Sequence, residues 1–487
     1  MSDMTSSDRR WWALGVLSIT QLMVALDATV INIALPHAQR DLHFSLANRQ
    51  WLITAYALAF GSLLLVGGRL SDLWGRRTSL YVGLTGFALA SALGGSAHSF
   101  TTLVTARAVQ GVFGAVLAPA ALATLSSTFS DPKERAKAFS IYGAIGASGA
   151  AIGLLLGGAL TQWATWRWCL FINLVFAAIA VVGVALFITG DKRTHDTNLD
   201  VVGTLLGSAG LFFVVYGFAH AVNTGWANYI TWGSLVIGVV LLVAFVRWQQ
   251  RSKNPLLPLR LLINRMRGGS LVALFLTSIG IFGISLFLAY YLQGTLGYSP
   301  LRTGVAFLPL VAAIALSAFV ASARLLAVSG PRPLVPTGML LSMLGMVLFT
   351  RLTPNPDYAS NVLPGLVVTG LGLGLIFAPA IASATAGVRL SDVGAASALV
   401  NTTQQIGGSM GVALLNTIAV SVTARSNAVK QPALSQSAAH NYAVLATLHG
   451  YAVAFWWAAA FFGVGAVFTF GLLESGVPDQ DGVPATT

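Results

Sequence analysis

The chain has 487 residues, of which 56% are hydrophobic and only 9% are charged, whereas an ordinary soluble domain has about 25% charged residues. With 27 basic and 15 acidic residues, there is too little charge to cover a water-soluble protein of this length, so a soluble enzyme is excluded. The net charge of +12 comes from basic residues that form no single patch, which argues against nucleic acid as a partner. The single cysteine, Cys169, excludes a disulfide framework and a multi-cysteine metal site.

Apolar runs long enough to cross a membrane follow one another along the chain. A helix needs about 20 apolar residues to cross about 30 Å of hydrocarbon. Fourteen such runs lie near residues 12–35, 50–70, 78–97, 101–125, 139–161, 168–190, 201–221, 230–248, 268–292, 303–327, 334–352, 361–386, 394–422 and 447–473. The first run is too long for the core of a signal peptide, so we expect it to be retained. The sequence predicts an all-α membrane protein with fourteen transmembrane helices.

Lysine and arginine are distributed unequally between the two predicted sides of the membrane. If the N-terminus is cytoplasmic, 19 of the 27 basic residues fall in cytoplasmic segments and 7 on the opposite side, with Arg107 inside a span. Because basic residues favour cytoplasmic loops, both termini are expected in the cytoplasm. We therefore expect a multi-pass protein of the cell's inner (plasma) membrane.

A faint repeat relates the two halves of the chain. The segment Gly68–Arg77 follows the second run, and the segment Ala323–Arg332 follows the tenth at an offset of 255 residues. The same offset places the first run over the ninth. This predicts an N-terminal six-helix bundle over residues 1–190, two additional helices over 191–250, and a C-terminal six-helix bundle with a short cytoplasmic tail over 251–487.

Several short motifs carry a family resemblance. Residues 26–36 read LDATVINIALP, residues 68–77 read GRLSDLWGRR, residues 107–111 read RAVQG, and further features lie at 290–300 and 405–408. In combination these segments resemble the major facilitator superfamily, in particular its fourteen-span drug:proton antiporter branch (EmrB/QacA type). That fold is built from parallel repeats about an axis along the membrane normal. One departure is Leu154, which stands where the antiporter signature normally carries proline.

The connection between the second and third runs is the first candidate site. The resemblance implies that Gly68, Asp72, Gly75, Arg76 and Arg77 form a gating loop. A carboxylate such as Asp72 can meet the positive, N-terminal end of a neighbouring helix and so hold one conformation. Anchoring to anionic lipid would suffice to explain the arginines but does not explain Asp72.

Two charged residues stand inside predicted spans. Asp27 is the only acidic residue well inside an apolar run, and Arg107 is the only basic one. An ionised carboxylate is costly in hydrocarbon, which makes Asp27 a natural proton carrier. From the helical rise, the two lie at depths of about 12 and 9 Å, so we expect them to pair in at least one conformation. The alternatives are a hydrogen bond that joins helices and a fixed structural ion pair.

Two further groups of residues complete the candidate set. Glycines at four-residue spacing favour close helix packing, and these are Gly149, Gly153 and Gly157, with Gly158 beside them. Polar and aromatic residues within the runs are candidates for the substrate cavity: Asn32, Tyr56, Gln110, Tyr290, Gln293, Phe377, Asn401, Gln404 and Gln405. Each of the buried amides could instead bond only to a neighbouring helix.

The predicted function is a proton-coupled multidrug or antibiotic efflux antiporter that exports amphipathic small molecules by alternating access. The sequence has no phosphate-binding loop of the G-x-x-x-x-G-K-S/T type, so the proton gradient is the expected energy source, with no cofactor and no metal. No set of polar catalytic groups suggests a membrane enzyme. The other expected partners are membrane lipids, and the protein is expected to work as a monomer. A facilitator or importer of a small organic solute, and a dedicated exporter of an endogenous secondary metabolite, are the alternatives.

Overall fold

The computed structural model describes residues 6–45, 48–129, 132–189, 200–252, 255–257, 264–321, 325–354, 357–386, 388, 393–428 and 436–474. All regular secondary structure in these residues is helical. Each of the fourteen predicted runs overlaps one helix of 19 residues or more. Twelve helices in this part of the chain are long and apolar enough to cross a membrane, and α2 and α5 contain the shorter apolar stretches Trp51–Leu64 and Ile152–Trp163.

The chain divides into two compact units. Unit 1 comprises Met1–Val214, Val236–Leu257 and Ser299–Val305, and unit 2 comprises Val215–Leu235, Pro258–Tyr298 and Ala306–Thr487. The division therefore passes through the two helices between the repeats, α7 (Val201–Thr224) and α8 (Tyr229–Gln249). The domain boundaries expected at residues 190 and 250 stay a prediction.

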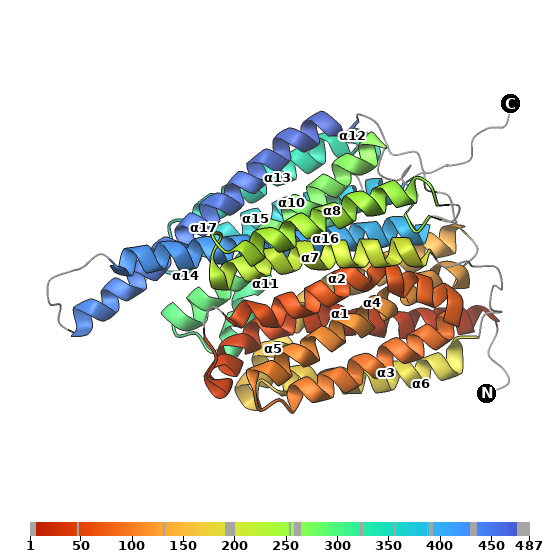
Figure 1. The fold of residues 1–487 in the computed structure, drawn as a ribbon, viewed down its shortest axis with the longest axis horizontal. Coiled ribbons are helices and arrows are strands. Elements are labelled where there is room, and N and C mark those ends of the chain that lie inside the picture. The colour runs from red at the N-terminus through yellow and green to blue at the C-terminus, as the bar shows by residue number, and fades with distance from the viewer. Residues whose placement is uncertain are drawn as a thin grey trace. The chain divides into compact units, whose positions relative to one another are not determined.

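Unit 1 contains the first six long helices, coloured red to yellow in Figure 1. They are α1 (Ser6–Leu42), α2 (Arg49–Trp74), α3 (Arg76–Gly95), α4 (Phe100–Thr128), α5 (Pro132–Trp163) and α6 (Trp168–Phe187). Helix α1 packs against α4, α5 and α6, while α4 also packs against α2 and α3. A buried core of leucine, alanine and aromatic side chains joins these helices, among them Leu17, Leu84, Phe87, Leu117 and Phe129.

Unit 2 repeats this packing scheme with the later helices. They are α10 (Arg265–Tyr290), the π-helix η2 (Tyr291–Thr295), α11 (Pro300–Val320, whose first residues belong to unit 1), α12 (Leu326–Ser329), α13 (Pro331–Phe349), α14 (Tyr358–Asn361), α15 (Leu363–Thr385), α16 (Val393–Ala428) and α17 (Gln436–Leu472). Helix α10 packs against α15, α16 and α17, as α1 packs against α4, α5 and α6. The pairs α13 with α15 and α13 with α17 match α3 with α4 and α3 with α6. The internal repeat therefore also holds for the helix packing.

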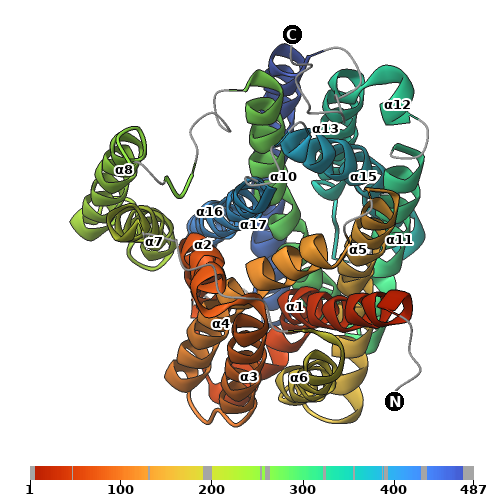
Figure 2. The same cartoon turned by 90° about the vertical axis from the view of Figure 1, so that its right-hand side faces the viewer.

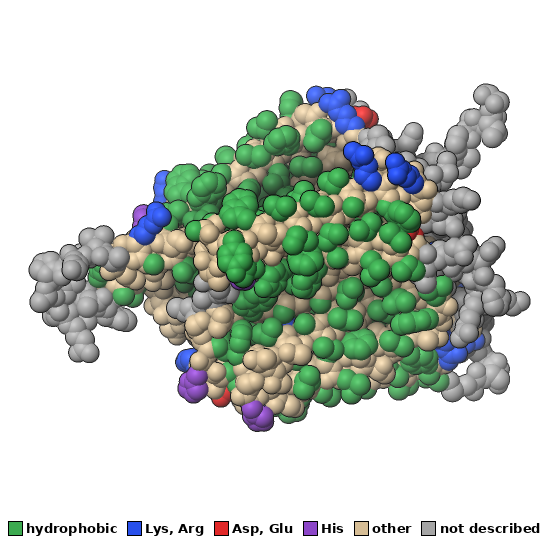
Figure 3. All heavy atoms as spheres, in the orientation of Figure 1, with side chains coloured by type: hydrophobic (Ala, Val, Ile, Leu, Met, Phe, Trp, Pro, Cys, Tyr) green, Lys and Arg blue, Asp and Glu red, His purple; other side chains and the backbone are tan. Residues whose placement is uncertain are grey.

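The helix ends extend beyond the predicted apolar runs. Helices α16 and α17 have 36 and 37 residues, or about 54 and 56 Å at about 1.5 Å per residue, which exceeds the hydrocarbon thickness of about 30 Å. Their polar ends stay helical because each added residue closes another backbone hydrogen bond. In the view of Figure 3, hydrophobic side chains cover the middle of the helices and charged side chains lie toward their ends.

Candidate functional site

The two charged residues of the predicted spans form an ion pair inside unit 1. Nη1 of Arg107, on α4, lies 2.6 Å from Oδ2 of Asp27, on α1. The side chains are 1% and 0% exposed, so both charges are removed from solvent. The pairing expected from their depths is confirmed, whereas the proton-carrying role of Asp27 stays a prediction.

Three polar side chains complete the surroundings of the carboxylate. Oδ1 of Asp27 accepts hydrogen bonds from Nε2 of Gln110 at 3.1 Å and from Nδ2 of Asn173 at 2.8 Å. The hydroxyl oxygen of Ser91 accepts from the same two amides at 2.6 and 3.3 Å. We call Asp27, Arg107, Gln110, Asn173 and Ser91 the charge cluster. Its residues come from α1, α3, α4 and α6, which lie together in Figure 2.

Helix α2 supplies further partners for the guanidinium. Nε of Arg107 donates to the carbonyl oxygen of Leu52 at 3.2 Å, and Nη1 also donates to Oε1 of Gln110 at 2.9 Å. The guanidinium carbon lies 4.5 Å from the centre of the Tyr56 ring, which stacks on Phe60. A cation over an aromatic face is stabilised by the ring quadrupole. Arg107 therefore has partners on three helices, α1, α2 and α4.

The local sequence of α4 explains why these groups meet. Arg107 and Gln110 are three residues apart, so they share one face of the helix and both reach Asp27. Gly111 follows directly, and a Cβ atom there would collide with the carbonyl of Tyr56 and lie 2.9 Å from the Cβ of Ala59. The glycine therefore allows α2 to approach closely enough for its backbone and Tyr56 to contact the arginine.

The predicted packing glycines of α5 face α1. A Cβ atom at Gly149 would lie 2.8 Å from the Cβ of Ala25, and one at Gly157 would lie 2.8 Å from Cγ2 of Val30. At Gly153 it would collide with Oγ1 of Thr29. These three glycines therefore bring α5 into close contact with the helix that carries Asp27. Gly158 is also buried, but it has different neighbours.

The predicted gating loop is a one-residue break between two helices. Gly75 separates α2 from α3 and has a φ of +84°, a conformation that side chains other than glycine disfavour. Arg76 and Arg77 begin α3, and Nη2 of Arg77 donates to the carbonyl of Ala185 near the end of α6 at 3.2 Å. Gly68 is half-buried on α2, and the side chain of Asp72 lies outside the described part of the chain.

The candidate cavity residues are divided between the two units. In unit 1, Asn32 is buried on α1, Tyr56 contacts Arg107 of the charge cluster, and Gln110 belongs to that cluster. The others lie in unit 2 and are half-buried: Tyr290 on α10, Gln293 on η2, Phe377 on α15, and Asn401, Gln404 and Gln405 on α16. Within the residues that the structure describes, no group of His, Cys, Asp and Glu could hold a metal ion.

Two members of the charge cluster, Asn173 and Ser91, are not among the site residues predicted from the sequence. Asn173 is the only amide within its apolar run, which is a usable signal because an isolated buried amide needs a partner. Ser91 carries no comparable signal, since a serine can bond to its own helix. Only the structure shows that both face Asp27.

Comparisons with known proteins agree with this architecture. The family model described as Major Facilitator Superfamily matches residues 17–412. The chain is 48% identical to the puromycin resistance protein pur8 of Streptomyces alboniger, over 96% of this chain and 92% of that protein. It is 34% identical to the cephamycin export protein CmcT of Amycolatopsis lactamdurans, over 85% of this chain and 86% of that one.

Two further similarities concern a multidrug pump and a solved structure. The chain is 33% identical to the multidrug efflux pump LfrA of Mycolicibacterium smegmatis, over 84% of this chain and 81% of that one. The crystal structure of a bacterial homologue of the human lysosomal transporter Spinster superposes with a TM-score of 0.63 at 17% identity, covering 96% of this chain and 99% of that chain. At this identity the structural similarity concerns the fold alone.

Proposed function

Since the chain belongs to the Major Facilitator Superfamily, and is therefore a membrane transporter and not an enzyme, we propose that it exports amphipathic small molecules in exchange for protons by alternating access. The observation that carries the proposal is the ion pair between Asp27 and Arg107, because it is buried inside a membrane helix bundle. Outward transport is supported by relatives that are named as resistance and export proteins.

Proton exchange follows from the chemistry of the charge cluster. The ionised carboxylate of Asp27 accepts from one guanidinium and two amides, so its charge is well stabilised in this arrangement. Protonation of Asp27 would remove the charge that holds Arg107. Arg107 would then be free to move toward another partner, and the bundle would lose a contact between α1 and α4. Proton binding and a change in helix packing are coupled in this way.

Coupling to the cargo needs competition between the cargo and the proton. A cargo that is bound beside α1 or α4 and holds Arg107 against Asp27 would favour proton release, so that the cargo and the proton exclude each other. Tyr56, which lies over the guanidinium, is placed to transmit cargo binding to Arg107. Asn32 and the half-buried polar residues of α10, η2, α15 and α16 are the proposed cavity residues, and Gly68–Arg77 is the proposed gating loop.

We also propose the fourteen-span, drug:proton antiporter type for this chain. All fourteen predicted runs overlap helices, and α7 and α8 follow the first repeat and precede the second. In α2 and α5 the shorter apolar stretches Trp51–Leu64 and Ile152–Trp163 lie within helices of 26 and 32 residues, long enough to cross the hydrocarbon. We propose an inner-membrane location with both termini cytoplasmic and a monomer as the working unit.

The direction of transport and its energy source are tested together in proteoliposomes. Purified protein is reconstituted, and the movement of puromycin and of a fluorescent cationic dye is measured with an imposed pH gradient and after its collapse by an ionophore. The proposal requires movement against the cargo's concentration gradient that stops when the pH gradient is collapsed. If the cargo moves only down its own concentration gradient, at the same rate with and without the pH gradient, the protein is a facilitator. This alternative is considered because Leu154 replaces the proline of the antiporter signature.

A second test distinguishes foreign drugs from an endogenous metabolite. Cells that express the protein are compared with cells that do not, in growth inhibition by a panel of amphipathic antibiotics. Resistance to several unrelated compounds supports the multidrug function. Resistance to one compound class alone supports a dedicated exporter, the function that the name of the cephamycin export protein suggests.

A further inference from the structure

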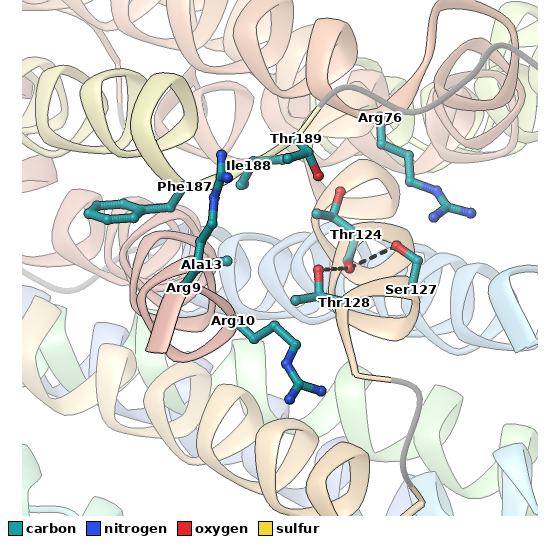
Figure 4. A pocket seen from close by; sticks show the side chains of 10 residues that line it. All are labelled: Arg9, Arg10, Ala13, Arg76, Thr124, Ser127, Thr128, Phe187, Ile188 and Thr189. Carbon is teal, nitrogen blue, oxygen red and sulfur yellow. Dashed lines mark hydrogen bonds between the residues drawn. The ribbon is translucent and has the colours of Figure 1, made fainter. Parts of the chain in front are cut away.

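A cavity of about 300 Å³ lies in unit 1 at the end where α1 and α3 begin and α4 and α6 end (Figure 4). Its volume is at the lower end of the range for small-ligand pockets. Its polar lining consists of guanidinium groups from α1 and α3, hydroxyl groups from the end of α4, and one hydroxyl after the end of α6, namely Arg9, Arg10, Arg76, Thr124, Ser127, Thr128 and Thr189. Figure 4 shows the arginines around the last turns of α4, each coming from a different direction.

The charge of this cavity is positive. Nη2 of Arg9 donates to the carbonyl of Leu186 at 3.5 Å. Nη1 of Arg10 lies 3.1 Å from Oε2 of Glu134, and the side chains of Arg10 and Glu134 are each 34% exposed. Each of these contacts engages one of the five N–H donors of a guanidinium. Glu134 is paired with Arg10, and none of the described residues that line the cavity carries a carboxylate, so the lining favours an anion.

Two local features add donors for such an anion. Helix α3 begins at Arg76 and has Gly75 as its N-cap, with no side-chain hydrogen bond to the cap, so its first N–H groups carry the positive end of the helix dipole. The hydroxyls of Ser127 and Thr128 now donate to the carbonyl of Thr124 at 3.1 and 2.7 Å. A hydroxyl hydrogen can rotate toward a bound oxygen, and therefore these groups can also serve an oxyanion.

The surroundings of the cavity place it at the surface of the membrane. Trp12 is 59% exposed and stacks on Phe187, which lines the cavity, with 5.6 Å between ring centres. Exposed aromatic rings gather at the level of lipid headgroups. From Phe187, exposed apolar side chains continue along one face of α6 at helical spacing: Leu186, Val182, Ile179 and Val175.

We propose that this cavity binds the phosphodiester headgroup of an anionic phospholipid, with the acyl chains along the exposed face of α6. Basic pockets between membrane helices recognise such headgroups by charge and by hydrogen bonds to phosphate oxygens. A soluble phosphate would satisfy the arginines but would leave the apolar track on α6 unused. The site is separate from the charge cluster and does not depend on proton coupling.

The test measures lipid binding by the purified full-length protein. Native mass spectrometry in detergent follows the binding of phosphatidylglycerol, with phosphatidylcholine as the neutral-headgroup comparison and inorganic phosphate as a competitor. The decisive pair of variants is Ser127→Glu, which adds a carboxylate at an exposed position of the lining, and Ser127→Gln, which has the same size without the charge. We expect Ser127→Glu to weaken phosphatidylglycerol binding at least about tenfold, and Ser127→Gln to keep it.

A second pair of variants removes the basic groups themselves. Arg9→Gln with Arg10→Gln should also weaken binding at least about tenfold. Arg247→Gln with Arg265→Gln removes the same net charge from α8 and α10 and should leave binding unchanged. Equal binding of phosphatidylcholine, displacement of the lipid by inorganic phosphate, or full binding by Ser127→Glu would each overturn the proposal. If the double arginine variant does not fold, the Ser127 pair decides.

Discussion

Asp27→Asn replaces one oxygen of the buried carboxylate with an amide NH₂ group. In the native cluster the two oxygens accept from Arg107, Gln110 and Asn173, all of which are donors at these contacts. An asparagine has one acceptor oxygen, so its NH₂ group must face at least one of these donors. The variant also leaves the charge of Arg107 without its counter-charge. Removing one partner of a buried ion pair costs about 3–5 kcal/mol, and we expect a loss of about 3 kcal/mol because the asparagine oxygen keeps part of the bonding.

The assay for its function is proton release on addition of cargo. Purified protein in weakly buffered detergent solution is mixed with a transported compound, and the released protons are followed with a pH indicator dye. We expect release from the native protein and none from Asp27→Asn, which can still bind cargo. Undiminished release from Asp27→Asn would refute the assignment and would place the coupling carboxylate elsewhere.

Asp41→Asn is the matched control for this variant. Asp41 lies on the same helix and has an arginine partner, Arg167, at the same 2.6 Å, but the side chains are 50% and 23% exposed. Exposed ion pairs contribute about 0–1 kcal/mol, so Asp41→Asn should change the thermal stability little and leave proton release intact. A comparable loss of stability in both variants would show that burial is not the source of the effect.

Three further substitutions test other parts of unit 1. Asp72→Asn in the gating loop should slow transport in proteoliposomes while the amount of folded protein stays near the native value, and native transport rates would contradict a gating role. Gly153→Ala should destabilise the protein by about 1–3 kcal/mol because its Cβ collides with Thr29, whereas Gly15→Ala, which has open space, should be neutral in the same thermal melt. Asn173→Ala should cost about 1–3 kcal/mol by removing a donor to Asp27, and a melt equal to the native one would show that this bond is not needed.

The sequence predicted the central pair of the site but not its surroundings. Asp27 and Arg107 could be found because charges within apolar runs are rare and because the helical rise gives their depth. Gln110 is one of the predicted cavity residues, and in the structure it is fully buried and donates to Asp27, while its part in the cavity stays a prediction. The rotation of each helix about its axis decides which polar residues meet, and it depends on packing against neighbours such as Gly111 and Tyr56.

The helices themselves were largely predictable, and the repeat only weakly so. Apolar runs locate a helix within the membrane, but they do not contain the polar turns that extend α16 and α17. The repeat is clearer in the structure than in the sequence. Arg77 and Arg332 are 255 residues apart and each begins the third helix of its repeat. Arg77 donates to the end of α6, and the guanidinium of Arg332 lies 5.2 Å from the Phe470 ring near the end of α17.

The same repeat shows what the helix packing requires. At the offset of 255 residues, the position of Asp27 corresponds to Phe282. Gly370 on α15 approaches the carbonyl of Leu310 and the Cβ of Ala313 as Gly111 approaches Tyr56 and Ala59, so the positions of Arg107 and Gln110 correspond to Leu366 and Thr369. Helix α10 nevertheless packs against α15, α16 and α17 in the scheme that α1 follows with α4, α5 and α6. This arrangement of helices therefore forms without a charge pair at its centre, which favours a functional role for the pair in unit 1 over a purely structural one.

This argument predicts the behaviour of an apolar replacement of the whole pair. Asp27→Leu together with Arg107→Met removes both charges and leaves none unpaired, and such replacements of buried ion pairs are often neutral or stabilising. The remaining cost is the unpaired Oε1 of Gln110, about 1–3 kcal/mol, since its Nε2 keeps the bond to Ser91. The double variant should therefore melt above the single variant Arg107→Met, which leaves the buried carboxylate of Asp27 without its counter-charge, while both lack proton-coupled transport. A double variant that is less stable than Arg107→Met would show that unit 1 needs the charges to fold, and that the parallel with unit 2 does not hold at this site.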